Sequence, residues 1–569
     1  MKKILYILTI LTVAGNFSCK KFLEEENLGG ITSTTYYTDT KGYESLIYSC
    51  YGSLRGIYDE DPFLFEYGTD VTTRGDQEAI SGTLGDRQTR AIGLNEYRTL
   101  APDNSGVSTI FTAAYRGIQR CNTAIERGPS IPGIDANLAK KRIGEASFIR
   151  AYYYFLLAEN FGDVPIVKEE INTVITHFVP NKEQEVYDFI LSDLNTALAS
   201  VDVTSTEFGR VTQGAVKNML ALVYLTRGYK SYGAPDDFTK AAQFADQVIT
   251  SGTYSLMPTF GEVFNYANQK NKEVIWSVQY DALSLTKSGS ANQNYGNGQN
   301  ILLGWRIYNE LGFLPGDQTY GRRIADYMPT QYLYTLYNTT KDARYDGTFL
   351  SQFYAVTTVT QAGRTVTKGD LRFYFPKWDQ PFTAQNEATL KAANPNVEVI
   401  TFPRWKQDFS NIGGAEKWPM VNKFYDPNAL LPNAQSGTYT STRDVFIFRL
   451  AETYLIAAEA YFKLNQTATA AERINVVRAR ATIAGQNMQI TPSEVNIDFI
   501  LDERARELEG EYKRWFDLKR THKLDRAFEN NILTKQANPG GVIDKYYLRP
   551  IPQSVIDRDS GGYPQNQGY

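Results

Sequence analysis

The sequence has few of the residues from which metal centres and disulfide frameworks are built. It contains two histidines and three cysteines in 569 residues. Neither His177 nor His522 lies in an HExxH pattern or near a Cys/Asp cluster, so the sequence predicts no zinc site. It also has no GxSxG elbow, Walker loop or dinucleotide fingerprint. We therefore expect no bound metal and no cofactor.

A strong excess of charge is also missing. Lys and Arg number 59 and Asp and Glu 63, which gives a formal net charge of -4. Removal of an N-terminal segment that contains Lys2, Lys3 and no acid would change this charge to -6. A surface that neutralises phosphates needs a large basic excess. We therefore expect no nucleic-acid partner.

Long hydrophobic runs are absent, and the longest candidate lies at the N terminus. It extends over residues 4–14 and follows Lys2 and Lys3. Spanning a bilayer takes roughly 20 apolar residues, so this run is too short for a transmembrane anchor. A positive start followed by a short apolar run is typical of an export signal. We expect residues 1–18 to be a signal peptide.

Cys19 follows the small residue Ser18 at the end of this signal, which is where bacteria attach diacylglycerol. Several acyl chains together anchor a protein stably, whereas one holds it only marginally. We predict that Cys19 is lipidated and that residues 19–40 form a tether. The other cysteines, Cys50 and Cys121, lie in helix-like stretches, and both a disulfide and two buried thiols remain open.

Helical spacing of apolar residues recurs along the chain. In residues 138–161 apolar side chains recur at steps of 3, 4 and 3, which predicts a helix that Gly162 and Pro165 end. Further helical stripes lie at 109–128, 215–229, 450–464 and 501–515. Helices joined by short turns, with small residues at their contacts, suggest hairpins stacked as in tetratricopeptide repeats.

Residues 252–442 have a different composition, rich in Gly, Asn, Gln, Thr and aromatic residues. A buried strand is expected at 273–279 and a hairpin at 356–367. Loops carry binding residues more often than scaffolds do, which makes this region the candidate for ligand contact. It contains five of the six tryptophans: Trp276, Trp305, Trp378, Trp405 and Trp418.

Four blocks of the sequence resemble the SusD/RagB family, in the order in which that family has them. They are KRIGEASFIRAYYYFLLAENFGDVPIV at 141–167, RVTQGAVKNMLALVYLTRGY at 210–229, RDVFIFRLAETYLIAAEAYFKLN at 443–465, and ILDERARELEGEYKRWFDLKRT at 500–521, followed by YYLRPIPQSVID at 546–557. Together these blocks extend over most of the chain.

The resemblance implies a mainly all-α fold of four tetratricopeptide-like hairpins, with a large loop-rich lobe and small β elements. We expect one such domain over 41–569, with helical parts at 41–251 and 443–569 and a loop-rich insertion at 252–442. The resemblance also implies a lipid-anchored, surface-exposed protein of the outer membrane. Such a protein captures a glycan for a SusC-like TonB-dependent transporter and is not an enzyme.

In the resembled family an early loop and a mid-chain loop contact the ligand. Flat aromatic faces can stack on sugar rings, with polar groups at the ring edges. Two regions fit this chemistry, one around residues 67–74 and one at 292–320. Packing in the core is the alternative for each aromatic residue. The candidate ligand-binding residues are Trp305, Tyr320, Tyr295, Tyr308, Tyr67 and Asp70.

Residues 503–520 are crowded with acids and bases. We interpret them as structural, because on a helix spacings of three and four form ion-paired faces, with Trp515 packed beneath. Arg449 and Glu452 are interpreted in the same way, as a helix-packing pair. A glycoside hydrolase remains an alternative, since two carboxylates suffice and the chain has 63 acidic residues. The sequence is also compatible with a peptide ligand and with a lid that has no ligand contact.

Overall fold

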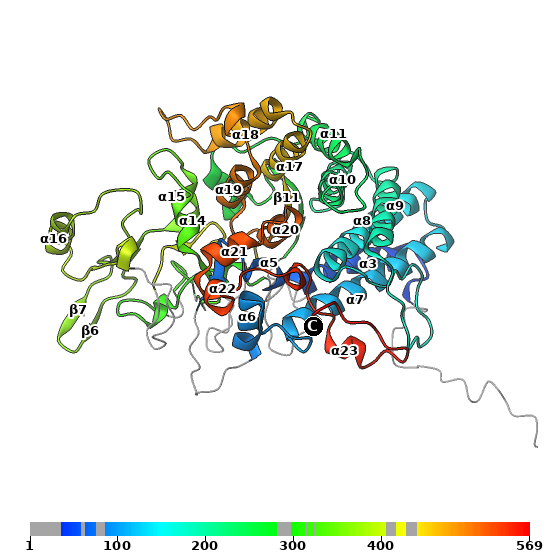
Figure 1. Cartoon of the computed structure of the whole chain (residues 1–569), viewed down its shortest axis with the longest axis horizontal. Coiled ribbons are helices and arrows are strands. Elements are labelled where there is room, and N and C mark those ends of the chain that lie inside the picture. Colours follow the sequence, from blue (N-terminus) through cyan, green and yellow to red (C-terminus); the bar gives the residue numbers. More distant parts are fainter. Residues whose placement is uncertain are drawn as a thin grey trace, which may run out of the picture.

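The computed structural model describes residues 36–58, 63–75, 86–280, 297–314, 317–321, 323, 325–404, 417–427 and 441–569. Helices dominate these residues and the strands are short, which confirms the predicted fold class. In Figure 1 the helices form an arch on the right and at the top, and a loop-rich lobe that includes the β6–β7 hairpin (Val359–Gln361 and Arg364–Val366) extends to the left.

The first helices pack around α8 (Ala136–Phe161), which confirms the helix predicted at 138–161. The Asp135 side chain caps this helix by accepting a hydrogen bond from the Leu138 amide at 2.9 Å, and Gly162 ends it with a φ of 73°. Residues 144–161 of α8 are buried on every face because other helices surround them. These neighbours are α3 (Thr40–Ser53), α7 (Ser105–Arg127) and α9 (Glu183–Leu198).

Two helical hairpins extend this array. They are α10 (Gln213–Arg227) with α11 (Asp237–Ile249), and α17 (Leu450–Lys463) with α18 (Thr467–Ala481). Helix α17 packs on α11, so the C-terminal helical part continues the array that the N-terminal part begins. Fully buried small residues in α17, such as Ala457, allow this close approach.

The stripe at 501–515 predicted one helix, and this prediction is wrong. The structure has two helices here, α19 (Ile497–Leu508) and α20 (Arg514–Arg520). Between them Gly510 and Tyr512 adopt φ values of 70° and 63°. Residues in this left-handed conformation end a helix, and apolar spacing alone does not report them.

The remaining helices are short and mostly join the larger elements. The α-helices are α4 (Arg55–Tyr58), α5 (Phe63–Glu66), α6 (Asp86–Glu96), α12 (Phe260–Val263), α13 (Gln299–Leu302), α14 (Gln331–Thr335), α15 (Arg344–Thr348), α16 (Ala384–Ala393), α21 (Asp525–Asn530), α22 (Ile532–Ala537) and α23 (Gln553–Ile556). The 3-10 helices are η2 (Gly128–Ser130), η3 (Tyr266–Asn268), η5 (Ile307–Asn309), η6 (Phe402–Arg404), η8 (Pro492–Glu494) and η9 (Asp544–Tyr547).

The strands form small separate sheets. Strand β2 (Val274–Val278), predicted at 273–279, pairs antiparallel with β11 (Val445–Arg449), and both are fully buried. This pair joins the beginning of the loop-rich insertion to its end. The predicted hairpin at 356–367 is confirmed as β6–β7. The other pairings are β1 (Thr72–Arg74) with β3 (Tyr327–Pro329), β4 (Phe349–Leu350) with β10 (Met420–Val421), and β5 (Gln352–Tyr354) with β8 (Leu371–Tyr374) and β9 (Glu398–Val399).

Membrane, metal and disulfide features can be checked within the described residues only. None of the helices described combines the length and the apolarity needed to cross a bilayer. The same residues contain no cluster of three or more His, Cys, Asp or Glu side chains that could hold a metal ion. Cys50 and Cys121 are buried free thiols. Cys19 and Trp405 lie outside the described residues.

Candidate ligand-binding region

The structure brings the early and the mid-chain candidate segments together. Strands β1 and β3 pair antiparallel, and the Tyr67 and Tyr327 ring centroids lie 4.6 Å apart. The Tyr67 hydroxyl donates a hydrogen bond to the Asp326 carbonyl at 3.2 Å. The Thr330 hydroxyl donates to the Asp70 carbonyl at 2.6 Å. The two segments therefore form one rigid unit although about 260 residues separate them.

Asp70 and Tyr67 are themselves buried in this unit, with exposed fractions of 0% and 1%. Arg514 contacts both carboxylate oxygens of Asp70, at 2.7 and 2.6 Å, and Arg526 lies 3.1 Å away. Burial alone would raise the pKa of Asp70, but these two guanidinium groups outweigh it and lower the pKa. Asp70 thus fastens the early segment to α20 and α21 and has no open face for a ligand.

Trp305 is also buried, with 1% of its surface exposed. Its indole nitrogen donates to the Trp418 carbonyl at 2.9 Å. Its ring packs at about right angles to Phe373, with centroids 5.2 Å apart, and lies 5.5 Å from the Phe353 ring. Trp305 is therefore at the centre of an aromatic core that holds the loop-rich lobe together.

Tyr320 supports an exposed aromatic residue that the sequence interpretation missed. Tyr320 is 8% exposed, and its hydroxyl accepts a hydrogen bond from the Tyr354 amide at 2.7 Å. Tyr354 is 43% exposed, because alternation along β5 places Phe353 inside and its neighbour outside. Tyr308 is half-buried, and Tyr295 lies outside the described residues. The alternation of polar and apolar side chains along residues 352–354 could have indicated that Tyr354 is exposed.

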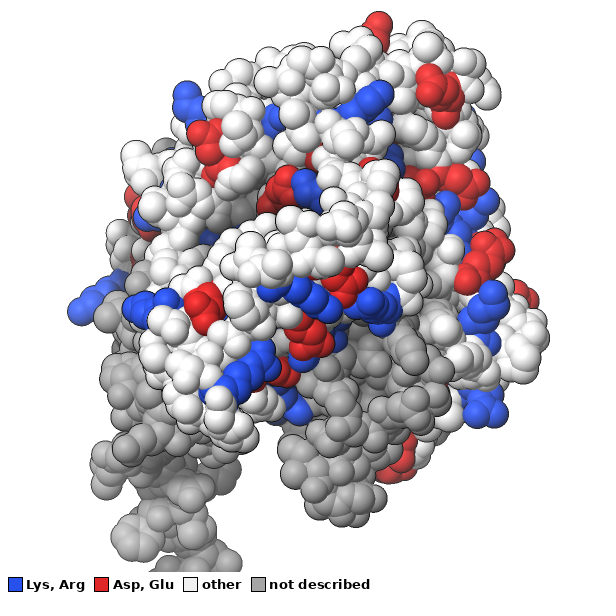
Figure 2. All heavy atoms as spheres, turned by 90° about the vertical axis from the view of Figure 1, so that its left-hand side faces the viewer, with Lys and Arg blue, Asp and Glu red and all other residues white. Residues whose placement is uncertain are grey.

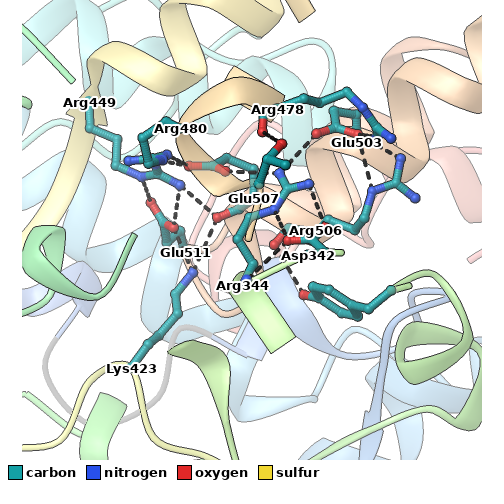
Figure 3. Close-up of polar contacts among 12 residues, drawn as sticks. Asp342, Arg344, Lys423, Arg449, Arg478, Arg480, Glu503, Arg506, Glu507 and Glu511 are labelled. Atoms are coloured by element: carbon teal, nitrogen blue, oxygen red, sulfur yellow. Dashed lines mark hydrogen bonds and ion pairs between the residues drawn. The ribbon is translucent and has the colours of Figure 1, made fainter. Parts of the chain in front are cut away.

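The charged block forms a buried ion-pair network (Figure 3). Arg449 lies 2.6 Å from Glu507, 2.7 Å from Glu511 and 3.0 Å from Glu273. The interpretation of Arg449 and Glu452 as a pair is therefore wrong. Arg449 is the last residue of β11 and directs its side chain to other elements, instead of along α17.

The network also joins the loop-rich lobe to α19. Arg344 in α15 contacts Asp342 at 2.8 Å, Glu503 at 2.9 Å and Glu507 at 3.0 Å. Only some pairs, such as Arg506 with Glu503 at 2.7 Å, have the helical spacing that the sequence suggested. The structural interpretation of this block fits the geometry, but most of the pairs link separate elements.

The carboxylates of this network do not suit acid–base catalysis. Burial would raise the pKa of Glu507, but Arg480, Arg449 and Arg344 outweigh it and lower the pKa to about 2. Arginines likewise outweigh burial at Glu503 and lower its pKa. A general acid needs a pKa near the working pH and access to substrate, and these buried, paired groups have neither.

Two further acids, Glu66 and Glu509, are buried with raised pKa values. Burial raises the pKa of Glu66 to about 7, although the Tyr512 amide donates to it at 2.7 Å. Burial and the nearby Glu66 raise the pKa of Glu509. The space between them has a volume of about 10 Å³, enough for about one water molecule. A sugar cannot enter it, so these acids are not a glycosidase pair in this conformation.

The described part of the loop-rich lobe's face carries charges of both signs. Figure 2 shows Lys and Arg interspersed with Asp and Glu on the described part of this face, and most of that surface is uncharged. A polyanion such as a nucleic acid binds a concentrated basic surface. This face suits a neutral, hydrogen-bonding ligand better.

The fold and this region define a class of protein: a stacked-hairpin scaffold that holds a loop-rich lobe rigidly through buried ion pairs and a buried aromatic core. Residues 272–569 match the model of the family described as "SusD family". Residues 21–225 match the model of the family described as "Starch-binding associating with outer membrane". The first match alone spans more than half of the chain. The chain belongs to the SusD family.

Relatives and solved structures agree with this assignment. The chain is 28% identical to SusD-like protein P2 of Formosa agariphila, with 100% of this chain and 99% of that protein covered. It is 26% identical to the starch-binding protein SusD of Bacteroides thetaiotaomicron, with coverages of 76% and 74%. A laminarin binding SusD-like protein has the same fold at 22% identity and a TM-score of 0.69, with coverages of 94% and 100%. Surface glycan-binding protein A from Bacteroides thetaiotaomicron, in complex with laminarihexaose, gives 18% identity and a TM-score of 0.66, with coverages of 93% and 100%.

Proposed function

We propose that the chain is a surface-exposed, lipid-anchored protein of the outer membrane that captures a glycan and delivers it to a SusC-like TonB-dependent transporter. The observation that carries the proposal is membership of the SusD family, together with the match of residues 21–225 to the family described as starch-binding and associating with the outer membrane. Similarity to a starch-binding relative over three quarters of the chain supports it. The mixed charge of the lobe face in Figure 2 is compatible with a neutral glycan.

Tyr308 and Tyr354 are the aromatic side chains that we propose for contact with sugar rings. Both are at least partly exposed, whereas Trp305 and Tyr320 are buried. Tyr320 holds the Tyr354 backbone through its hydroxyl, and Trp305 packs on the neighbouring Phe353. Stacking on one aromatic ring contributes about 1 kcal/mol, roughly a fivefold change in affinity. Tyr295 remains a predicted contact.

Glycan binding can be measured by calorimetry on the purified chain with starch and with laminarin oligosaccharides. We expect Tyr354→Ala to weaken binding about fivefold. Tyr48→Ala is the control, because Tyr48 is 54% exposed on α3, outside the lobe. Equal affinity of parent, Tyr354→Ala and Tyr308→Ala would argue against these contacts. Full uptake by cells carrying both variants would favour a lid without ligand contact.

The same binding experiment distinguishes glycan capture from peptide capture and from hydrolysis. Binding of peptides with no response on a broad glycan array would favour a peptide ligand. Release of new reducing ends from a bound glycan during prolonged incubation would favour a hydrolase. We expect no hydrolysis, since the acids described above are ion-paired or enclosed, and we expect a glycan ligand on the family evidence given above.

The anchor and the partner can be tested in membranes. Cys19→Ala is expected to release the chain from the outer-membrane fraction, and retention there would refute the lipid anchor. A tagged parent chain is expected to co-purify with a TonB-dependent barrel from detergent-solubilised outer membranes. Recovery of the chain alone would count against delivery to such a transporter.

A further inference from the structure

A second cavity lies between three segments that are far apart in sequence. It has a volume of about 540 Å³ and opens between α7, residues 165–178 and residues 554–563. In Figure 1, α7 and α23 lie at the lower right, whereas α16 and the β6–β7 hairpin lie at the far left. None of the described residues that line the cavity lies in the loop-rich region 252–442, so the cavity is separate from Tyr308 and Tyr354.

The walls of this cavity are mostly carbon. Helix α7 contributes Phe111, Tyr115 and Ile118 from one face. Residues 165–178 and α23 provide the facing aliphatic and aromatic side chains, among them Val167, Ile171, Phe178 and Val555. The apolar surface continues outside, since Ile175 at the rim is 46% exposed. Such a cavity favours an apolar body.

Hydrogen bonds fix the walls in place. The Tyr115 hydroxyl donates to the Pro165 carbonyl at 2.8 Å. The Asp559 carboxylate lies 2.7 Å from His177 and accepts from the Phe178 amide at 2.8 Å. These contacts join all three segments, so the cavity is preformed and a ligand would not have to order it.

Among the described residues, the polar groups around the cavity include more unpaired cations than unpaired anions. Arg116 and Arg558 line it as exposed residues, and the side chain of neither forms a hydrogen bond or an ion pair with any residue that the structure describes. The nearby carboxylate of Asp559 is already occupied by His177 and by backbone amides. Tyr563 is only 5% exposed, and its hydroxyl has no partner among the described residues. The cavity therefore offers cations and a hydroxyl donor without an internal anion.

The volume and the composition together limit the ligand. At about 30 Å³ for each non-hydrogen atom, 540 Å³ holds roughly 18 such atoms. A sugar of that size would bring many hydroxyl groups against carbon walls, where unpaired polar groups are costly. We propose that this cavity binds an amphiphilic anion, an apolar chain or ring system of about a dozen carbons that ends in a carboxylate or similar acid.

Laurate is the probe for this proposal. Dodecanol, which has the same chain length but no charge, is the control ligand. The Cys19→Ala chain is used because it requires no detergent that would compete for the cavity. We expect saturable one-to-one binding of laurate by calorimetry, below its micelle concentration. Affinity is expected to rise roughly fourfold for each methylene added from octanoate to laurate. Dodecanol is expected to bind several-fold more weakly, because it cannot pair with the two arginines.

Two variants and one control test the location. Ser554 lines the cavity, so Ser554→Trp adds a large ring to the lining and is expected to weaken laurate binding at least tenfold. Arg116→Gln combined with Arg558→Gln is expected to remove the preference for laurate over dodecanol. Ala392→Trp, on the exposed surface of α16, is expected to change neither affinity. Thermal melting of each variant verifies that it folds.

The outcomes separate this proposal from the glycan proposal. Absence of laurate binding, or laurate binding unaffected by Ser554→Trp, would overturn the amphiphile site and leave glycan binding untouched. Loss of starch or laminarin binding in Ser554→Trp would overturn it too, since the cavity would then be a glycan site. Phosphatidylglycerol vesicles bound by the parent but not by Ser554→Trp would support it with a membrane lipid as the source. Laurate binding without vesicle binding would support a free amphiphile.

Discussion

Replacing Arg449 with Met should reveal how much the buried network contributes to stability. Met retains much of the apolar stem but removes the charge from contacts of 2.6 to 3.0 Å with Glu507, Glu511 and Glu273. Leaving buried carboxylates without their cation typically costs about 3–5 kcal/mol. The acids keep other partners, since Arg480 contacts Glu273 and Glu507 and Lys423 contacts Glu511. We therefore expect a loss of about 3 kcal/mol, at the lower end of that range.

The assay is urea unfolding at pH 7, followed by tryptophan fluorescence and interpreted at constant slope. Arg473→Met is the matched control, because Arg473 and Asp246 are 2.9 Å apart with side chains about one quarter exposed. An exposed pair of this kind contributes less than about 1 kcal/mol. Equal effects of the two substitutions would refute the reasoning, because burial would then make no difference.

The effect of Arg449→Met should also depend on pH. The folded pKa of Glu507 is about 2, compared with an ordinary value of 4.5. A carboxyl with a lowered folded pKa stabilises the protein above its unfolded pKa, and this stability is lost as the pH falls through the folded pKa. Arg449→Met lacks part of this stabilisation, because Arg449 is one of the arginines that lower the pKa of Glu507. The difference between parent and variant should therefore shrink between about pH 4.5 and pH 2, and a constant difference would contradict this explanation.

Three further predictions test single features. Gly510→Ala should destabilise the chain by about 2–4 kcal/mol in urea unfolding, because φ is 70° at this position and a Cβ atom would lie 2.7 Å from the Phe424 ring. An unchanged urea midpoint would show that Gly510 relieves no strain. Burial raises the pKa of Asp444 to about 6, so its contribution to stability is present at low pH and is lost as the pH rises to about 6. Asp444→Asn should flatten the change in unfolding free energy between pH 4 and pH 7, and an unchanged slope would count against it. Cys50 and Cys121 are buried, and burial raises the pKa of Cys121, so a thiol reagent should modify them only after unfolding.

The sequence alone predicted the local elements of the fold. Residues 138–161, 215–229 and 450–464 became helices, and 273–279 and 356–367 became strands, because apolar spacing and turn residues act over a few positions. The family blocks located the helical parts. The prediction of one helix at 501–515 was wrong, because the left-handed residues Gly510 and Tyr512 end the helix without changing the spacing of the apolar residues.

The sequence located the two segments of the candidate site, but it did not show which of their aromatic residues are exposed. The early and mid-chain segments do meet, through β1 and β3. Whether an aromatic ring faces solvent or a neighbour depends on what packs against it. Trp305 and Tyr67 have aromatic neighbours that cover them, whereas Tyr354 is turned outward by strand alternation.

The tertiary structure alone decided the partners of the buried charges and the position of the second cavity. Asp70 pairs with Arg514 across 444 residues of sequence, and Arg449 pairs with Glu507 across 58. The walls of the cavity come from three segments that begin at residues 111, 165 and 554. Helical periodicity reports which face of an element is apolar, because neighbouring residues set it. Which distant element covers that face, or neutralises a charge beside it, is a property of the folded chain as a whole.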